Sequence, residues 1–133
     1  NLYNMSYFLF LDDFRQPRDA FNYTKNILYT TKNWLVVRSY NEFVKCIEEN
    51  GVPHTISFDH DLADAHYEEQ ETIAYDKYIE KTGYHCATWL IKYCIDNKLK
   101  LPTAVLIHSM NPVGSQNIRS IFDNYHKVMN LPS

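Results

Sequence analysis

The residues best suited to chemistry stand directly after three apolar segments of the chain: Asp12-Asp13, Asp59-His60-Asp61 and His108-Ser109. In an open α/β sheet, ligands bind beyond the carboxyl ends of the strands, so neighbouring strands would bring these groups to one edge. Carboxylates that meet there repel one another, and a hard divalent cation such as Mg²⁺ or Mn²⁺ relieves that repulsion through oxygen ligands. The pattern therefore predicts a cation site whose ligands are Asp12, Asp13, Asp59 and Asp61.

The histidines in this set add chemistry that a turn-forming aspartate does not. His60 and His108 beside carboxylates suit general acid–base catalysis near neutral pH, or binding of a softer metal such as Mn²⁺ or Zn²⁺. We therefore expect His60, His108 and Asp59 to be the catalytic residues. Any single aspartate after a strand more often makes a turn or caps a helix, so the prediction depends on three strand ends acting together.

Groups that could hold a phosphate occur near the same positions. Arg15, two residues after the acid pair, could bind a phosphate with both arms of its guanidinium. The turn from Pro112 to Gly114 precedes a predicted helix, whose first backbone N–H groups suit an anion. Asn111 and Asn117 could hydrogen-bond the same ligand, although asparagines at such positions often bond to the backbone instead.

Continuous apolar runs predict strands that are buried on both faces, as in a parallel sheet. These strands are expected at residues 7–11, 34–38, 54–58 and 104–107. Apolar residues at helical spacing predict helices that run from Ser39 or Asn41 to Gly51, from Thr82-Gly83 to about Asn97, and over 117–128. Residues 14–18 break regular structure at Pro17, and residues 19–32 are expected to be a loop that could contain one helical turn.

This alternation of strands and helices predicts a doubly wound parallel α/β sheet of about four strands with right-handed crossovers. A length of 133 residues fits a single domain that spans 1–133. Residues 63–82 carry six acids against two lysines, which favours a solvated acidic insertion; a flap over the site is the alternative. Because position 1 is Asn and not Met, residues 1–6 could be an artificial addition to the natural chain.

The composition narrows the function classes. Thirteen basic against sixteen acidic residues give a net charge of −3, which excludes a protein that binds duplex DNA by charge alone. Three isolated glycines exclude the Walker A and GxGxxG nucleotide-binding loops. The apolar runs are too short for a membrane span.

The remaining sequence signals concern the compartment and self-association. Three cysteines without a CxxC pair predict buried, reduced thiols. No signal peptide is recognisable, so a cytoplasmic protein is expected. Several of the eleven tyrosines lie outside core patterns, which leaves a homo-oligomer open.

Motifs at the three strand ends resemble the cyclic-phosphate processing receiver-like family, which is related to response-regulator receiver domains. The motifs are Leu11-Asp12-Asp13-Phe14-Arg15, Ile56-Ser57-Phe58-Asp59-His60-Asp61-Leu62, and His108-Ser109-Met110-Asn111-Pro112-Val113-Gly114 with Asn117-Ile118. The helix after Gly83 also fits, and the similarity extends over about residues 7–125. It implies a flavodoxin-like fold and an Mg²⁺ site at Asp12, Asp13 and Asp59. It also implies that Ser109 takes the position of the hydroxyl residue that follows the fourth strand of a receiver domain.

The chain also departs from a receiver domain. Receiver domains have a fifth strand with a lysine and a full helix after the first strand, and neither is predicted here. In addition His60, Asp61 and His108 crowd the site, which a phosphorelay receiver does not need. These differences favour phosphoester chemistry over phosphoryl signalling.

The resemblance and the strand-end residues together lead us to expect a metal-dependent phosphoesterase that processes a cyclic phosphate of a nucleotide or an RNA end. Members of the family are frequent in phages and bacteria, which implies the cytoplasm of a bacterium or of an infected host cell. Two alternatives stay open. One is a non-catalytic binder that sequesters a cyclic-nucleotide signal, as in phage counter-defence, and the other is a degenerate receiver that accepts a phosphoryl group on Asp59.

Overall fold

Short apolar segments form a parallel sheet in the part of the chain that the structure describes, residues 7–62 and 82–129 of a computed structural model. In these residues the strands are β1 (Phe8–Leu11), β2 (Trp34–Val37), β3 (Thr55–Phe58) and β4 (Ala104–Ile107), in the spatial order β2-β1-β3-β4. β3 is buried at every position, whereas β4 at the edge is half-buried throughout. The predicted parallel α/β sheet is confirmed.

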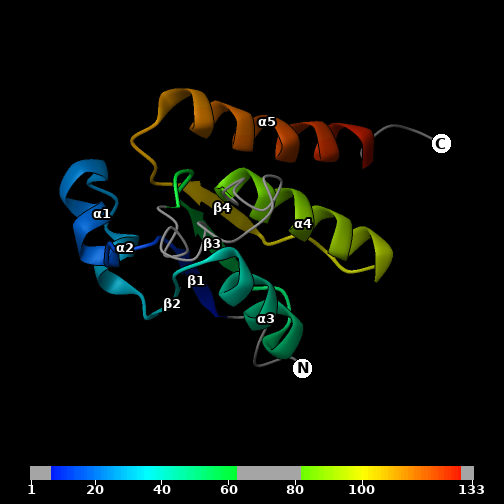
Figure 1. The fold of residues 1–133 in the computed structure, drawn as a ribbon, viewed down its shortest axis with the longest axis horizontal. Helices are drawn as coiled ribbons and strands as arrows, with labels where there is room; N and C mark the ends of the chain where they lie inside the picture. Colours follow the sequence, from blue (N-terminus) through cyan, green and yellow to red (C-terminus); the bar gives the residue numbers. More distant parts are fainter. Residues whose placement is uncertain (1–6, 63–81, 130–133) are drawn as a thin grey trace, which may run out of the picture.

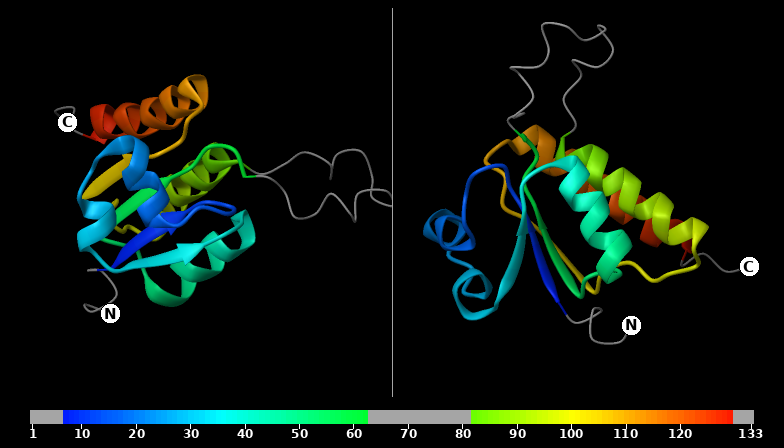
Figure 2. Two further views of the ribbon diagram at one scale, coloured as in Figure 1. Left: turned by 90° about the vertical axis from the view of Figure 1, so that its left-hand side faces the viewer. Right: turned by 60° about the horizontal axis from the view of Figure 1, so that its bottom comes forward.

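Helices cover both faces of this sheet (Figures 1 and 2). α1 (Pro17–Thr24) and α2 (Leu28–Thr31) lie on one face, and α3 (Tyr40–Asn50), α4 (Gly83–Asp96) and α5 (Pro112–Met129) lie on the other. This division follows from right-handed crossovers between parallel strands. The chain first moves outward from β1 to β2, and then returns past β1 to β3 and continues to β4, so α3 and α4 pack on the opposite face. α5 follows the last strand and packs against α4 on that face.

An apolar cluster packs on each face of the sheet. β1 shows the division, because Leu9 and Leu11 belong to the cluster with α3, α4 and α5, whereas Phe10 belongs to the cluster with α1 and α2. Leu90 of α4 and Ile118 of α5 are fully buried in the first cluster. Close packing on both faces holds the strands, and therefore the residues just beyond them, in fixed positions.

Polar side chains explain where several helices begin. The Ser39 hydroxyl accepts a hydrogen bond from the N–H of Glu42 at 3.1 Å at the start of α3, so Ser39 is the cap of that helix. Thr82 caps α4 in the same way. At the start of α5, Oδ1 of Asn111 accepts from the N–H of Gly114 at 2.9 Å.

Two expectations about the helices are wrong. Residues 17–24 and 28–31 form α1 and α2 where the sequence predicts a loop with one turn, and α5 begins at Pro112 and not at Asn117. In α1 and α5 the cause is a proline at the first helical position, where its missing N–H costs nothing and its fixed φ suits a helix. Gln16 and Asp19 close a capping box around the start of α1.

Other predictions fall partly outside the described residues. The acidic segment 63–82 lies outside them except for Thr82, and residues 1–6 lie outside them as well. The three cysteines are buried thiols, as predicted. None of the helices in the described ranges is long and apolar enough to cross a membrane.

Candidate functional site

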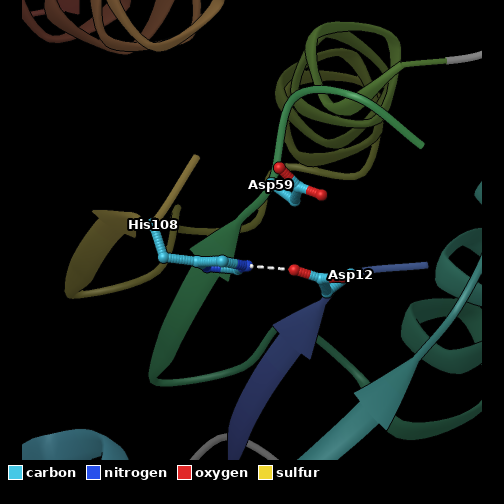
Figure 3. Close-up of side chains that lie close together, drawn as sticks. All are labelled: Asp12, Asp59 and His108. Carbon is cyan, nitrogen blue, oxygen red and sulfur yellow. Dashed lines mark hydrogen bonds and ion pairs between the residues drawn. The ribbon is translucent and has the colours of Figure 1, made fainter. Parts of the chain in front are cut away.

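The register of the sheet brings the polar strand ends together at one edge. β1, β3 and β4 end in register, and the residues after them continue the ladder of backbone hydrogen bonds. The N–H of Asp59 donates to the carbonyl of Leu11 at 3.0 Å, and the N–H of His108 donates to the carbonyl of Phe58 at 3.0 Å. Asp12, Asp59 and His108 therefore lie side by side (Figure 3).

Asp12 is fully buried, and hydrogen bonds hold both of its carboxylate oxygens. Oδ1 accepts from the N–H groups of Phe14 at 3.0 Å and Arg15 at 2.8 Å, and Oδ2 is 3.0 Å from Nε2 of His108. Burial alone would raise the pKa of Asp12, but the donors from His108 and from the backbone outweigh burial and lower the pKa. Asp12 is therefore a preorganised anion.

His108 is buried as well, and both of its ring nitrogens are bonded inside the protein. Its Nδ1 is 2.6 Å from Oγ of Ser57, which is 2.7 Å from the hydroxyl of Tyr29. The ring stacks on Phe10 with centroids 4.3 Å apart, and the Tyr23 hydroxyl donates to the carbonyl of His108. Burial lowers the pKa of His108, so its imidazole is neutral near pH 7.

Asp59 has the opposite electrostatics, although it is only 3% exposed. Burial is the largest cause, and the charges of Asp12 and Asp13 add to it, so that the pKa of Asp59 is raised to about 7. The backbone N–H of His60 and the charge of Arg15 offset only part of this effect. Asp59 is therefore the carboxyl group of this edge that can gain or lose a proton near neutral pH.

Asp12, Asp59 and His108 could hold a metal ion, because each offers a ligand atom and these atoms lie within 4.8 Å of one another. Carboxylate oxygens suit Mg²⁺ or Mn²⁺, and an imidazole nitrogen would favour a softer ion such as Zn²⁺. The raised pKa of Asp59 fits such a site, since a cation would relieve the repulsion among the carboxylates. Asp13 contributes to that repulsion and is therefore close by.

A more exposed cluster, His60, Asp61 and Asn111, lies beside this group. Nδ1 of His60 is 2.8 Å from Asp61, and the amide nitrogen of Asn111 is 3.3 Å from both Asp61 oxygens and 3.5 Å from the same Nδ1. The structure thus joins Asp61 to His60 and Asn111. Among the described residues, the group that could hold a metal ion does not include Asp61.

Two glycines let helix starts approach the segment after β3. A Cβ at Gly83 would collide with the backbone carbonyl of Asp59, and the Gly83 N–H donates to the carbonyl of His60 at 2.7 Å. A Cβ at Gly114 would collide with the His60 ring. α4 and α5 therefore begin directly against the residues that carry the candidate chemistry.

Arg15 lies beside Asp12, between exposed apolar side chains. Its guanidinium nitrogen is 3.8 Å from Oδ2 of Asp12, and its guanidinium carbon is 4.8 Å from the centre of the Phe14 ring. The other guanidinium nitrogen is 3.6 Å from the sulfur of Met110. Phe14 and Met110 are 66% and 65% exposed, so a cation and two apolar surfaces border the carboxylates.

A family model of the cyclic-phosphate processing receiver domain matches residues 7–124 of this chain. The chain belongs to this family. Comparisons with curated proteins and with solved structures give no match. The resemblance seen in the sequence is confirmed, and this cyclic-phosphate processing receiver domain has the parallel sheet that the resemblance implied.

The remaining predicted residues of the receiver domain lie around the start of α5. Oγ of Ser109 accepts from the N–H of Asn111 at 3.0 Å, and the N–H of Gly114 donates to the Asn111 side chain. Asn117 is exposed on the second turn of α5. Ser109, Asn111 and Gly114 therefore belong to one turn beside His60, while Asn117 lies further along the helix.

Tyr29 and Ser57 were not predicted to belong to the site. Ser57 offered a signal, because a hydroxyl inside a fully buried apolar strand must find a hydrogen-bond partner. Tyr29 offered none, since its segment shows no clear apolar periodicity and its contact depends on the packing of α2 against the sheet.

Proposed function

We propose that this receiver domain hydrolyses a cyclic phosphate ester of a nucleotide or of an RNA end, with the help of a divalent cation. The proposal is carried by the pair of buried carboxylates at adjacent strand ends, Asp12 and Asp59. Their repulsion contributes to the raised pKa of Asp59, and positive charge at this place would relieve it. The family description supports the substrate class.

Asp12 and Asp59 would hold the cation, with Asp13 close by. Mg²⁺ or Mn²⁺ fits such oxygen ligands best, and Zn²⁺ becomes the better fit if the imidazole of His108 takes part. A cation bound there polarises phosphoryl oxygens and lowers the pKa of a water molecule. Asp12 is already an anion, whereas Asp59 must first release its proton.

Arg15 is the residue best placed to bind the phosphate. Its side chain is 24% exposed and lies beside Asp12, so the guanidinium can reach a ligand that sits just outside the carboxylates. On the other side, Ser109, Asn111 and Gly114 at the start of α5 would border the substrate, and Asn117 on the next turn of the helix would lie further from it. Because the Gly114 N–H already donates to Asn111, we assign the main role to Arg15.

Phe14 and Met110 favour a substrate that carries a nucleobase. Both side chains are largely exposed, and both contact the guanidinium of Arg15. Aromatic rings of this kind stack on nucleobases with little regard to base identity. A base that lies on this apolar surface would place the attached phosphate near Arg15.

His60 is the better candidate of the two histidines for moving a proton. His108 is buried with both ring nitrogens bonded to protein groups, so a substrate has no access to its ring. The His60 side chain is 17% exposed, and Asp61 holds its Nδ1, which leaves Nε2 as the nitrogen that can face a substrate. Proton transfer by a histidine placed in this way is ordinary general acid–base catalysis.

The proposal is tested with 2′,3′-cyclic mononucleotides and cyclic dinucleotides in the presence of Mg²⁺, Mn²⁺ or Zn²⁺. We expect the intact chain to open one of these phosphates, and Asp59→Asn and His60→Gln to lower kcat/KM at least about 100-fold. Asp96→Asn makes the same chemical change as Asp59→Asn on an exposed carboxylate of α4 and should leave kcat/KM unaltered.

Two results would contradict the catalytic assignment. One is equally slow turnover of every substrate by the intact chain and by Asp59→Asn. The other is tight binding in calorimetry followed by recovery of the intact ligand with each metal present, which would make the domain a binder of the same ligand class.

A further inference from the structure

We propose that Tyr29 and Ser57 are positioning residues, which fix the ring orientation of His108 and through it the carboxylate of Asp12. The four residues form one hydrogen-bonded chain. The Tyr29 hydroxyl is 2.7 Å from Oγ of Ser57, and the same Oγ is 2.6 Å from Nδ1 of His108. On the other side of the ring, Nε2 of His108 is 3.0 Å from Oδ2 of Asp12. The role assigned to Asp12 at the end of this chain rests on the proposed cation site.

The direction of every hydrogen bond in the chain follows from its last member. An ionised carboxylate can only accept, so Nε2 of His108 carries a proton and donates it to Asp12. The buried ring is neutral, which leaves Nδ1 as an acceptor and makes the Ser57 hydroxyl its donor. The Ser57 oxygen then accepts from Tyr29, whose hydroxyl donates.

Ser57 is needed to orient His108 because the imidazole ring fills nearly the same space in two orientations. Rotation by half a turn about the bond from Cβ to the ring exchanges nitrogens and carbons, and this torsion has little intrinsic preference. Only one of the two orientations places Nδ1 on Ser57 and Nε2 on Asp12. Stacking on Phe10 holds the ring plane but does not distinguish the two orientations, so the hydrogen bond from Ser57 acts together with the bond to Asp12 to select one of them.

The chain also determines which part of Asp12 can meet a cation. Oδ1 accepts from two backbone N–H groups, those of Phe14 and Arg15, so both of its lone pairs are engaged. Oδ2 accepts from His108 and keeps one lone pair. If Nε2 of His108 bound the cation instead, it could not donate to Asp12, so His108 orients the anion in this arrangement and is not itself a ligand.

The first measurement needs no cation. In protein labelled with ¹⁵N at histidine, we expect His108 to carry its proton on Nε2 and to exchange it slowly with water, with the signal assigned by its loss in His108→Gln. Ser57→Ala should speed this exchange at least about tenfold, and Tyr29→Phe should speed it less, because it acts one bond further away.

Matched controls remove the same chemical groups at other places in the fold. Thr55→Val removes a buried hydroxyl from the same strand, and Tyr7→Phe removes the hydroxyl of a half-buried tyrosine that donates to the carbonyl of Gly51 at 2.6 Å. Neither should change the exchange of the His108 proton. A proton on Nδ1 in the intact chain, or exchange in Ser57→Ala no faster than in Thr55→Val, would overturn the positioning role.

The second measurement is Mn²⁺ titration, followed by the magnetic resonance signal of the free ion. Loss of an outer hydrogen bond of this kind typically weakens metal affinity about 10- to 100-fold, so we expect about tenfold for Ser57→Ala. In an Asp12→Asn background the same change should have no further effect. If the intact chain binds no Mn²⁺, the proposed cation site fails, while the proton exchange still decides the positioning role.

Discussion

Asp12 and Asp59 follow adjacent strands and are almost equally buried, yet their pKa values shift in opposite directions. At the end of β1, three donors face the carboxylate, from His108 and from two backbone N–H groups, and the pKa falls. At the end of β3, the carboxyl group faces two other acids, and the pKa rises to about 7. Burial raises the pKa of both carboxyl groups, and the number of donors around each one decides whether the net shift is downward or upward.

Asp12 and Asp59 therefore have different roles at this edge of the sheet. Asp12 keeps its charge and its position whether or not a ligand is present, because its oxygens are already bonded. Asp59 has a pKa near neutrality, so its charge depends on pH and would also respond to the proposed cation. A fixed anion and a responsive one thus stand side by side on neighbouring strands (Figure 3).

The largest expected effect on stability comes from His108→Leu, which removes the side-chain donor of Asp12. This change leaves the Asp12 carboxylate, a buried charge, without its side-chain donor, and the loss of a donor to a buried charged group typically costs about 3 kcal/mol or more. We expect the free energy of unfolding in urea to fall by about that amount. The double variant Asp12→Asn/His108→Leu should recover part of the loss, and a loss below about 1 kcal/mol would show that His108 does not hold Asp12.

Because the pKa of Asp59 is raised, we expect the substitution Asp59→Asn to stabilise the folded chain. The pKa of Asp59 is about 7 in the folded chain against 3.8 for an ordinary aspartate, so between these values the unfolded chain releases a proton that the folded chain keeps. The free energy of unfolding therefore falls as the pH rises through this range, and the cost is complete above about pH 7. Asp59→Asn should remove that cost.

We expect Asp59→Asn to match the intact chain near about pH 4 and to exceed it by about 2–4 kcal/mol near about pH 8, without a cation. Urea denaturation at both pH values measures this difference. Asp96→Asn, on an exposed carboxylate of α4, should shift stability equally at both. A constant difference between Asp59→Asn and the intact chain would mean that Asp59 keeps an ordinary pKa.

The contrast between the two aspartates also shows what the sequence could predict. The strands and the acids that follow them could be found, because continuous apolar runs and abrupt polar ends are local patterns. Parallel pairing of β1, β3 and β4 then brings the ends together by register alone. The convergence of Asp12, Asp59 and His108 was therefore within reach of sequence reasoning.

The surroundings of the two carboxylates were not within reach. Asp12 and Asp59 look alike in sequence, and the donors that distinguish them come from His108, whose ring is bonded to Ser57, and from a loop backbone. Tyr29, which bonds to Ser57, lies in the short helix α2, within a stretch that the sequence predicts as a loop that could contain one helical turn. The direction of a pKa shift depends on such contacts between distant segments, which no local pattern encodes.

A smaller effect concerns the affinity for a cation and its dependence on pH. Because a cation must displace the proton of Asp59, Mn²⁺ affinity should rise about tenfold per pH unit below about pH 7 and level off above it. Titration of Mn²⁺ at a series of pH values tests this. In Asp59→Asn the affinity should be lower and nearly independent of pH over the same range, whereas an unchanged pH profile would place the displaced proton on another group.

The smallest expected effect on stability is that of Arg15→Gln, and it separates the two kinds of donor at Asp12. The guanidinium is partly exposed and 3.8 Å from Oδ2, whereas the backbone N–H of the same residue donates to Oδ1 at 2.8 Å and survives the substitution. Exposed ion pairs contribute about 0–1 kcal/mol, so the unfolding free energy should fall by less than about 1 kcal/mol. Affinity for a cyclic nucleotide, measured by calorimetry, should fall at least about tenfold, because the phosphate loses a charged hydrogen-bond partner. A loss of stability as large as that of His108→Leu would instead mean that the guanidinium, and not the imidazole and the backbone, keeps Asp12 ionised.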